Sequence, residues 1–204
     1  MLYNRRWLFF FVLCLILCPV SPVLAQSGAT AQVKAVLDKA MEIQTKPELQ
    51  GTEHRKERST QIRKLIADNF ASADMARESL QDHWERLSGQ QRSQYQELFT
   101  GLFQDSYTRM VLNFLKQETV EYPEEKPEGK FVKVMTVIMR TNEHIPVDYI
   151  LEQKGQRWLI RDVIIDHVSI IDNYRNAFGA ALSKQSFDAL LQKMRIQKKA
   201  GEDN

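Results

Sequence analysis

The amino-acid sequence predicts an α+β fold in which helices pack on one face of a curved antiparallel sheet and enclose an apolar cavity. Up to residue 115, apolar residues recur at the three- to four-residue spacing of amphipathic helices. Residues 131–165 are instead rich in β-branched and aromatic side chains and alternate in polarity with a period of two. Helical spacing returns from about residue 172. Helices, then strands, then helices is the order of an α+β domain with its helices on one face of the sheet.

The first segment, residues 1–25, has the features of a cleaved secretory signal peptide. Two arginines precede an apolar run that ends at Cys18, and the small-residue site Val23–Ala25 follows. The apolar run is about twelve residues long, whereas ~20 are needed to span a bilayer, so the sequence favours cleavage over a retained anchor. We therefore expect one exported domain over residues 26–197, followed by a charged, frayed tail over 198–204.

Removal of this segment changes the composition of the mature chain. Both cysteines are lost, so the mature protein has no thiol, disulfide or cysteine metal site. Lys+Arg falls from 28 to 26, which equals the 26 Asp+Glu residues. A nucleic-acid-binding domain usually carries a basic excess, so a nucleic-acid partner is not expected. Export without cysteine fits a bacterial periplasmic protein.

The helical half of the sequence contains one element longer than the others. A first helix is expected over residues 29–44, and helical faces recur over residues 62–87 after a polar link. Ser88-Gly-Gln-Gln91 matches a capping box, which would open a helix with an apolar stripe reaching Leu115. A stripe this wide is typical of a helix lying across a sheet, and a helix that also walls a cavity is the alternative.

The sheet is expected to follow a loop over residues 122–130, where two prolines and Gly129 interrupt both periodicities. Three strands are expected after it, over residues 131–140, 145–154 and 157–165. Gly155 would form the tight turn between the last two strands. Closing helices are expected from about Asp172 and from about Ser186.

Catalytic motifs do not stand out in this sequence. None of the four histidines has the spacing of a metal ligand pair, so no metal site or cofactor is expected. The densest polar group is Asp162, Asp166, His167 and Ser169. His167 and Ser169 lie two positions apart on one strand, about 6–7 Å from each other, which is too far for a nucleophile and its base. We therefore expect Ser169 to satisfy the backbone at the strand end.

A small-molecule enzyme is an alternative interpretation. A curved sheet under helices is similar to a nuclear-transport-factor-like cone with extra helices, and such cones host isomerases and dehydratases. The candidate residues for that chemistry are Asp148, Tyr149 and Tyr107. This interpretation rests on analogy between folds alone.

An ordered series of residues follows a known family pattern through nearly the whole mature chain. Its helical part is Asn69-Phe70, Met75-Ala76, Leu80, His83-Trp84, Leu87-Ser88, Gln91-Arg92, Tyr95, Phe99 and Tyr107. Its later part is Ile145–Leu151, Trp158, Asp162-Val163, Val168-Ser169, Tyr174-Arg175, Phe178 and Phe187–Leu190. The series resembles the MlaC family of periplasmic phospholipid-binding proteins, also named toluene tolerance proteins. One departure is His167, where that family usually has Gly.

The resemblance implies a monomeric phospholipid carrier with no catalytic group, whose bound phospholipid is cargo and not a cofactor. The carrier would move lipid between an outer-membrane lipoprotein/porin complex and an inner-membrane ABC transporter complex, and so maintain outer-membrane lipid asymmetry. Two acyl chains carry about 30 methylenes, and exposing each to water costs ~0.8 kcal/mol, so a free lipid faces roughly 24 kcal/mol. A carrier of another lipid, such as a hopanoid, and a pure interaction module remain alternatives.

The lipid tails are expected to lie between the longest helix and the sheet. Matching the family segments places Tyr107 and Val168 on the cavity wall. Strand alternation and helical spacing add Met110, Val134, Ile138, Tyr149, Leu151 and Val163. A carboxylate at Val168 would then lie against acyl chains, so Val168→Glu is expected to fold but to bind no lipid.

Overall fold

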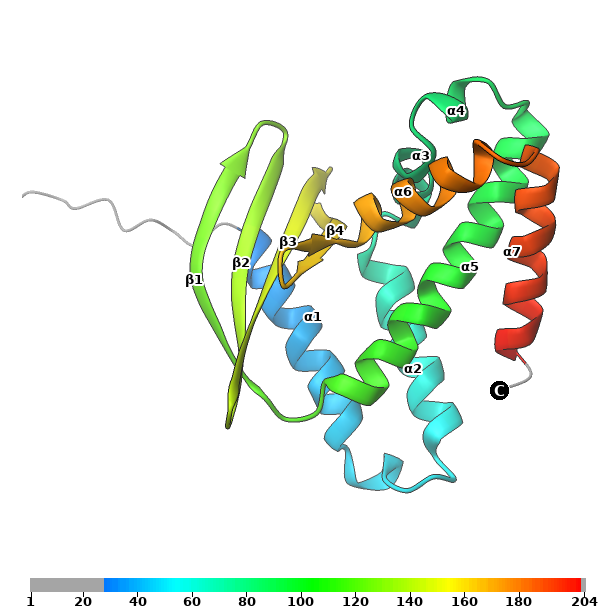
Figure 1. The fold of residues 1–204 in the computed structure, drawn as a ribbon. Coiled ribbons are helices and arrows are strands. Elements are labelled where there is room, and N and C mark those ends of the chain that lie inside the picture. The colour runs from blue at the N-terminus through cyan, green and yellow to red at the C-terminus, as the bar shows by residue number, and fades with distance from the viewer. Residues whose placement is uncertain (1–27, 203–204) are drawn as a thin grey trace, which may run out of the picture.

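The computed structural model describes residues 28–202 and places the helices on one side of a five-stranded sheet (Figure 1). The helices are α1 Gly28–Thr45, α2 Arg55–Asn69, α3 Ser72–Leu80, α4 Asp82–Glu85, α5 Gly89–Phe114, α6 Ile170–Leu182 and α7 Phe187–Glu202, with a 3-10 helix at Pro47–Leu49. The strands are β1 Thr119–Glu128, β2 Phe131–Arg140, β3 Glu143–Lys154, β4 Arg157–Ile165 and β5 Val168–Ser169. All neighbouring strands pair antiparallel, in chain order. The predicted α+β class is confirmed.

The longest helix, α5, begins where the sequence predicts. The Ser88 hydroxyl accepts a hydrogen bond from the Gln91 backbone N–H at 3.2 Å, and the Gln91 side chain accepts one from the Ser88 N–H at 3.1 Å. This reciprocal capping box satisfies two amides that the helix itself cannot pair, and such a cap contributes about 1 kcal/mol. α5 has 26 residues and runs diagonally beside the sheet, from the α7 side towards the end of α1 (Figure 1).

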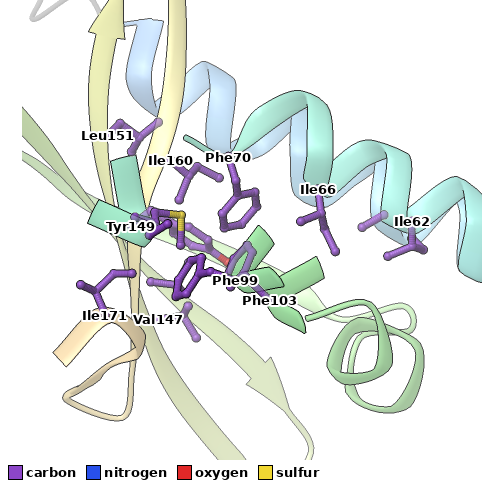
Figure 2. Close-up of a cluster of buried hydrophobic side chains, with 14 of the residues drawn as sticks. Ile62, Ile66, Phe70, Phe99, Phe103, Val147, Tyr149, Leu151, Ile160 and Ile171 are labelled. Carbon is purple, nitrogen blue, oxygen red and sulfur yellow. The ribbon is translucent and has the colours of Figure 1, made fainter. Parts of the chain in front are cut away.

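Aromatic side chains fill one part of the interface between the helices and the sheet. Phe70, which follows α2, lies 5.3 Å from Phe103 of α5, measured between ring centroids. One turn earlier on the same face of α5, Phe99 contacts Tyr174 of α6 at 5.1 Å. Figure 2 shows Phe70 and Phe103 gathered with Ile160 of β4 in this core. The rings join α2, α5, α6 and the sheet into one hydrophobic core.

Most of the segment expected to be a loop over residues 122–130 is a strand instead, and only Gly129 and Lys130 form a turn. β1 pairs with β2 along most of its length, with a register shift between Glu121 and Glu124. Proline is tolerated at such bulges and on edge strands, where its missing N–H breaks no ladder hydrogen bond. β1 is the edge of this sheet, so Pro123 and Pro127 do not prevent strand formation. The expectation was wrong because position within the sheet outweighed local propensity.

The turn between β4 and β5 requires an unusual backbone at Asp166 and His167. Their φ angles are 46° and 66°, so both residues lie in the left-handed region. Two consecutive positive φ angles fit a tight hairpin turn of the kind that usually contains Asn, Asp or Gly. Asp and His occupy this region more readily than most side chains. His167 therefore occupies a backbone conformation that Gly adopts without strain.

The two ends of the chain can be compared with the domain limits expected from the sequence. The predicted signal peptide lies outside the described residues. At the other end, residues 198–202 of the expected tail belong to α7, which ends at Glu202. The Lys198 ammonium lies 3.9 Å from the Glu97 carboxylate of α5, and its stem reaches Gly101. Within residues 28–202, no helix has the length and apolar character needed to cross a membrane.

Candidate functional site

An apolar pocket of about 310 Å³ lies between the helices and the sheet. Its walls come from α1, α2, α5 and the three central strands, and nearly every lining side chain is aliphatic or aromatic. The lining residues are Val36, Leu37, Ala40, Ile62, Leu65, Ile66, Phe70, Tyr107, Met110, Val111, Phe114, Leu115, Ile138, Arg140, Ile145, Val147, Tyr149, Ile160 and Ile165. Figure 2 shows Ile62 and Ile66 of α2 across from Val147 and Tyr149 of β3.

Strand alternation produces the sheet wall of the pocket. In the register of β2 and β3, Ile138 pairs with Ile145 and Thr136 pairs with Val147, which places these side chains on one face. The Thr136 hydroxyl donates a hydrogen bond to the Val147 carbonyl at 2.6 Å. The polar hydroxyl is thereby satisfied within the sheet, and the wall stays apolar.

On the helix side of the pocket, one side chain of α1 holds the end of α5. The Gln44 amide of α1 donates hydrogen bonds to the carbonyls of Val111, Leu112 and Leu115, at 3.0, 3.2 and 2.7 Å. Carbonyls in the last turn of a helix lack the usual partner four residues later, although that of Val111 also accepts from the Leu115 N–H at 3.0 Å. Gln44 therefore caps α5 beside the pocket and ties it to α1.

Four of the eight residues predicted to contact lipid lie on the pocket wall. These are Tyr107 and Met110 from α5, Ile138 from β2 and Tyr149 from β3. The long helix and the sheet thus meet at one pocket, as the alternation and helical spacing predict. Contact between these four residues and a lipid stays a prediction.

Three further predicted residues lie in the solid core beside the pocket. Val134, Leu151 and Val163 have exposed fractions of 0% and are not lining residues. They lie on the correct face of the sheet but beneath the helices that cover it. Alternation identifies the buried face of a strand, and only tertiary contacts decide which part of that face borders the pocket.

Val168, the eighth residue, is not on the pocket wall. Its side chain is 61% exposed, although its strand partner Ile165 lines the pocket. β5 is only two residues long and α6 begins immediately after it, so no element covers Val168. The expectation that Val168 forms part of the wall is therefore wrong in this structure.

The α1 and α2 walls were not predicted from the sequence. The aliphatic residues of these helices, including Val36, Ala40, Ile62 and Ile66, line the side of the pocket that faces the sheet and α5. Their helical spacing was visible in the sequence, but spacing does not identify what a helix packs against. Their role could be found only from the three-dimensional arrangement.

The two phenols on the wall remain uncharged. Burial raises the pKa of the Tyr107 hydroxyl well above its usual range, and the neighbouring Tyr149 adds to the increase. Burial also raises the pKa of Tyr149. Both side chains are therefore protonated throughout the physiological range and place no charge against an apolar ligand.

The polar group at the β4–β5 turn is structural. The Asp162 carboxylate accepts hydrogen bonds from the Ser169 hydroxyl and from the backbone N–H groups of Val163, at 2.8 Å, and Ile171, at 3.1 Å. Ser169 in turn accepts from the Asp172 N–H at 3.0 Å and is the N-cap of α6. Burial raises the pKa of Asp162, and these hydrogen bonds partly offset the increase. The predicted backbone role of Ser169 is confirmed.

Of the three residues of the enzyme alternative, Tyr107 and Tyr149 line the same pocket, and Asp148 does not join them. Asp148 forms an ion pair with Lys133 at 2.8 Å, whereas its strand neighbour Tyr149 faces the pocket on the opposite side of the sheet. Across the described part of the chain, no three His, Cys, Asp or Glu side chains are grouped so that they could hold a metal ion.

Two relatives share part of this chain. It is 27% identical over 104 residues to the toluene tolerance protein ttg2D of Pseudomonas putida, which aligns 50% of this chain with 48% of that protein. It is 24% identical over 120 residues to the intermembrane phospholipid transport system binding protein MlaC of Haemophilus influenzae, with 56% of each chain aligned. The chain thus spans about half the length of both relatives.

A solved structure shares the fold. It is a phospholipid-binding protein from Ralstonia solanacearum in complex with a phospholipid, with a TM-score of 0.72 and 21% sequence identity. The match covers 85% of this chain and 98% of that chain. In addition, the family model of the MlaC protein matches residues 34–196, which include every residue that lines the pocket. The chain belongs to the MlaC family.

Proposed function

We propose that this protein is a periplasmic phospholipid carrier that holds its cargo by the acyl chains and catalyses no reaction. The observation that carries the proposal is the pocket between α5 and the sheet, with its almost wholly apolar wall and a volume of about 310 Å³. Ligand sites are commonly apolar cavities of ~300–1,000 Å³ with a few polar groups that fix orientation. The two uncharged tyrosines and the single arginine on this wall match that description.

The proposed path runs between an outer-membrane lipoprotein/porin complex and an inner-membrane ABC transporter complex, and it would maintain outer-membrane lipid asymmetry. The name of the Haemophilus relative, an intermembrane phospholipid transport system binding protein, supports transport of phospholipid between membranes. The energetics are consistent with a dedicated carrier, because roughly 24 kcal/mol opposes the exposure of two acyl chains to water. The carrier must therefore cover the chains during transit and release them only to a docked partner.

Native mass spectrometry of the exported protein, followed by lipid extraction, tests this function. A bound species of phospholipid mass is expected. A hopanoid or another apolar species in its place would overturn the assignment of the cargo. Protein that carries no lipid, both as purified and after incubation with phospholipid vesicles, would overturn the carrier function itself.

A further inference from the structure

Arg140 is the only charged residue among the described residues that line the pocket. It ends β2 on the same face as Ile138, and its side chain is 30% exposed. Phe114, at the end of α5, also lines the pocket and is 61% exposed. These two residues mark the mouth, where the end of α5 approaches the β2–β3 hairpin. A lipid held by its tails would have its head group at this position.

The Arg140 guanidinium is oriented by a backbone carbonyl and by two carboxylates. It donates a hydrogen bond to the Phe114 carbonyl. The Glu118 carboxylate lies 3.5 Å away and the Glu143 carboxylate 3.7 Å away. Both ion pairs are longer than a charge-assisted hydrogen bond of about 2.7–2.9 Å, so the guanidinium retains donor capacity for a further anion.

The two carboxylates differ in how firmly they are held. Glu118 is 12% exposed and accepts a hydrogen bond from the Lys116 backbone N–H at 2.6 Å. Glu143 is 63% exposed, at the start of β3. Glu118 therefore positions Arg140, whereas Glu143 can turn toward a second ligand group.

We propose that this mouth recognises a zwitterionic phospholipid head group, with Arg140 donating to the phosphate and Glu143 accepting from the ammonium. The inference rests on the proposed carrier function and specifies its lipid class. A guanidinium matches the geometry of phosphate oxygens and can donate to two of them. The guanidinium has two carboxylates as its ion-pair partners, which together carry one more negative charge than it carries positive charge. A head group that brings its own cation fits these surroundings better than an anionic one.

Loading from mixed vesicles tests the proposal. Delipidated protein is incubated with vesicles of equimolar phosphatidylethanolamine and phosphatidylglycerol, recovered, and extracted for mass spectrometry. Wild-type protein is expected to be enriched about two- to fivefold in phosphatidylethanolamine, the range of a partly exposed ion pair. Glu143→Gln is expected to lose this enrichment and to keep its total phospholipid. Equal loading of the two lipids by wild type would overturn the proposal.

A second arm isolates the phosphate contact. Vesicles that also contain diacylglycerol offer the same tails without a phosphate. Wild-type protein is expected to bind phospholipid in preference to diacylglycerol. In Arg140→Gln the ratio of bound phospholipid to bound diacylglycerol is expected to fall about tenfold, as expected for the loss of a hydrogen bond to a charged group. An unchanged preference in Arg140→Gln would overturn the role of Arg140.

Arg157→Gln is the matched control for these variants. Arg157 is also a sheet arginine that donates to a carbonyl at the end of a helix, that of Asp68, but it does not line the pocket. The lipid bound by the Arg157→Gln variant is expected to have the same composition as the lipid bound by wild type. A change in composition equal to that of Arg140→Gln would overturn the specific role of the mouth. Wild-type protein that acquires no lipid from any vesicle would instead refute the carrier function, so the two failures are distinguishable.

Discussion

At the scale of single residues, His167 occupies a backbone conformation that favours glycine. The turn between β4 and β5 needs a left-handed backbone, and His167 adopts it with φ of 66°. A side chain in this region costs of order 1 kcal/mol or more. The neighbouring Asp166 N–H donates to the Pro146 carbonyl at 3.0 Å, which ties the turn to β3. The surrounding sheet therefore holds the strained turn in place.

His167→Gly is expected to raise the free energy of unfolding by about 0.5–1 kcal/mol. Glycine removes the strain, although part of the gain is lost to its greater freedom in the unfolded chain. Chemical denaturation measures the difference. The matched variant is Gly155→His, which places the same side chain at a φ of 63° in the β3–β4 turn and should lower stability by about 1 kcal/mol. Destabilisation by both variants would contradict the assignment of strain to His167.

At the scale of elements, a buried arginine joins α3 to the sheet. Arg161 of β4 has a side chain that is 7% exposed, and its guanidinium lies 2.8 Å from the carboxylates of both Asp74 and Glu152. It also donates to Glu78 of α3. Burial by itself would raise the pKa of Asp74, but the hydrogen bonds and charges of Lys154 and Arg161 outweigh it and lower that pKa. The contribution of Asp74 to stability is thus present above its unfolded pKa and is lost as the pH falls through the folded pKa.

Arg161→Met is expected to lower the free energy of unfolding by about 2–3 kcal/mol. Breaking a buried ion pair typically costs about 3–5 kcal/mol. A smaller loss is expected here because the acidic partners of Arg161 are partly exposed to solvent. Arg77→Met is the control, since Arg77 pairs with Glu85 where both side chains are 62% exposed, and it should change stability little. Equal effects of the two variants in urea denaturation would contradict this account.

At the scale of the whole molecule, the pocket exists because a curved sheet and three helices leave space between them. The aromatic core closes this space at one end, and the capped end of α5 borders it at the other. A carboxylate introduced into the wall would have no partner there, and its burial would disfavour an apolar ligand.

Ile138→Glu is therefore expected to fold and to lose at least about tenfold of its bound phospholipid, because a buried unpaired charge costs several kcal/mol. Met139→Glu is the matched control, since the adjacent residue on β2 points to the other face of the sheet. Circular dichroism checks the fold of each variant, and lipid extraction measures the cargo. Wild-type lipid content in a folded Ile138→Glu protein would refute the placement of the tails.

Local sequence signals predicted most of the elements. The capping box at Ser88 fixed the start of α5, and the run over residues 131–140 matched β2. β1 was missed because its prolines suit an edge strand, and edge position is a property of the assembled sheet. Within the site, residues on α5 and the inner face of the sheet were predictable from periodicity. The contributions of α1 and α2 were not, because a periodic helix face does not specify its partner.

Periodic patterns in the sequence were enough to predict the α+β class, the buried face of each central strand and the apolar stripe of α5. These follow from local periodicity, which depends only on the geometry of helices and strands. The tertiary structure alone decided that Val134 and Val163 are solid core while Tyr149 borders the pocket, and that Val168 is exposed. It also brought Arg140 to the pocket mouth beside the end of α5, 26 residues earlier in the chain. Such contacts depend on how the layers meet, and no periodic pattern records that.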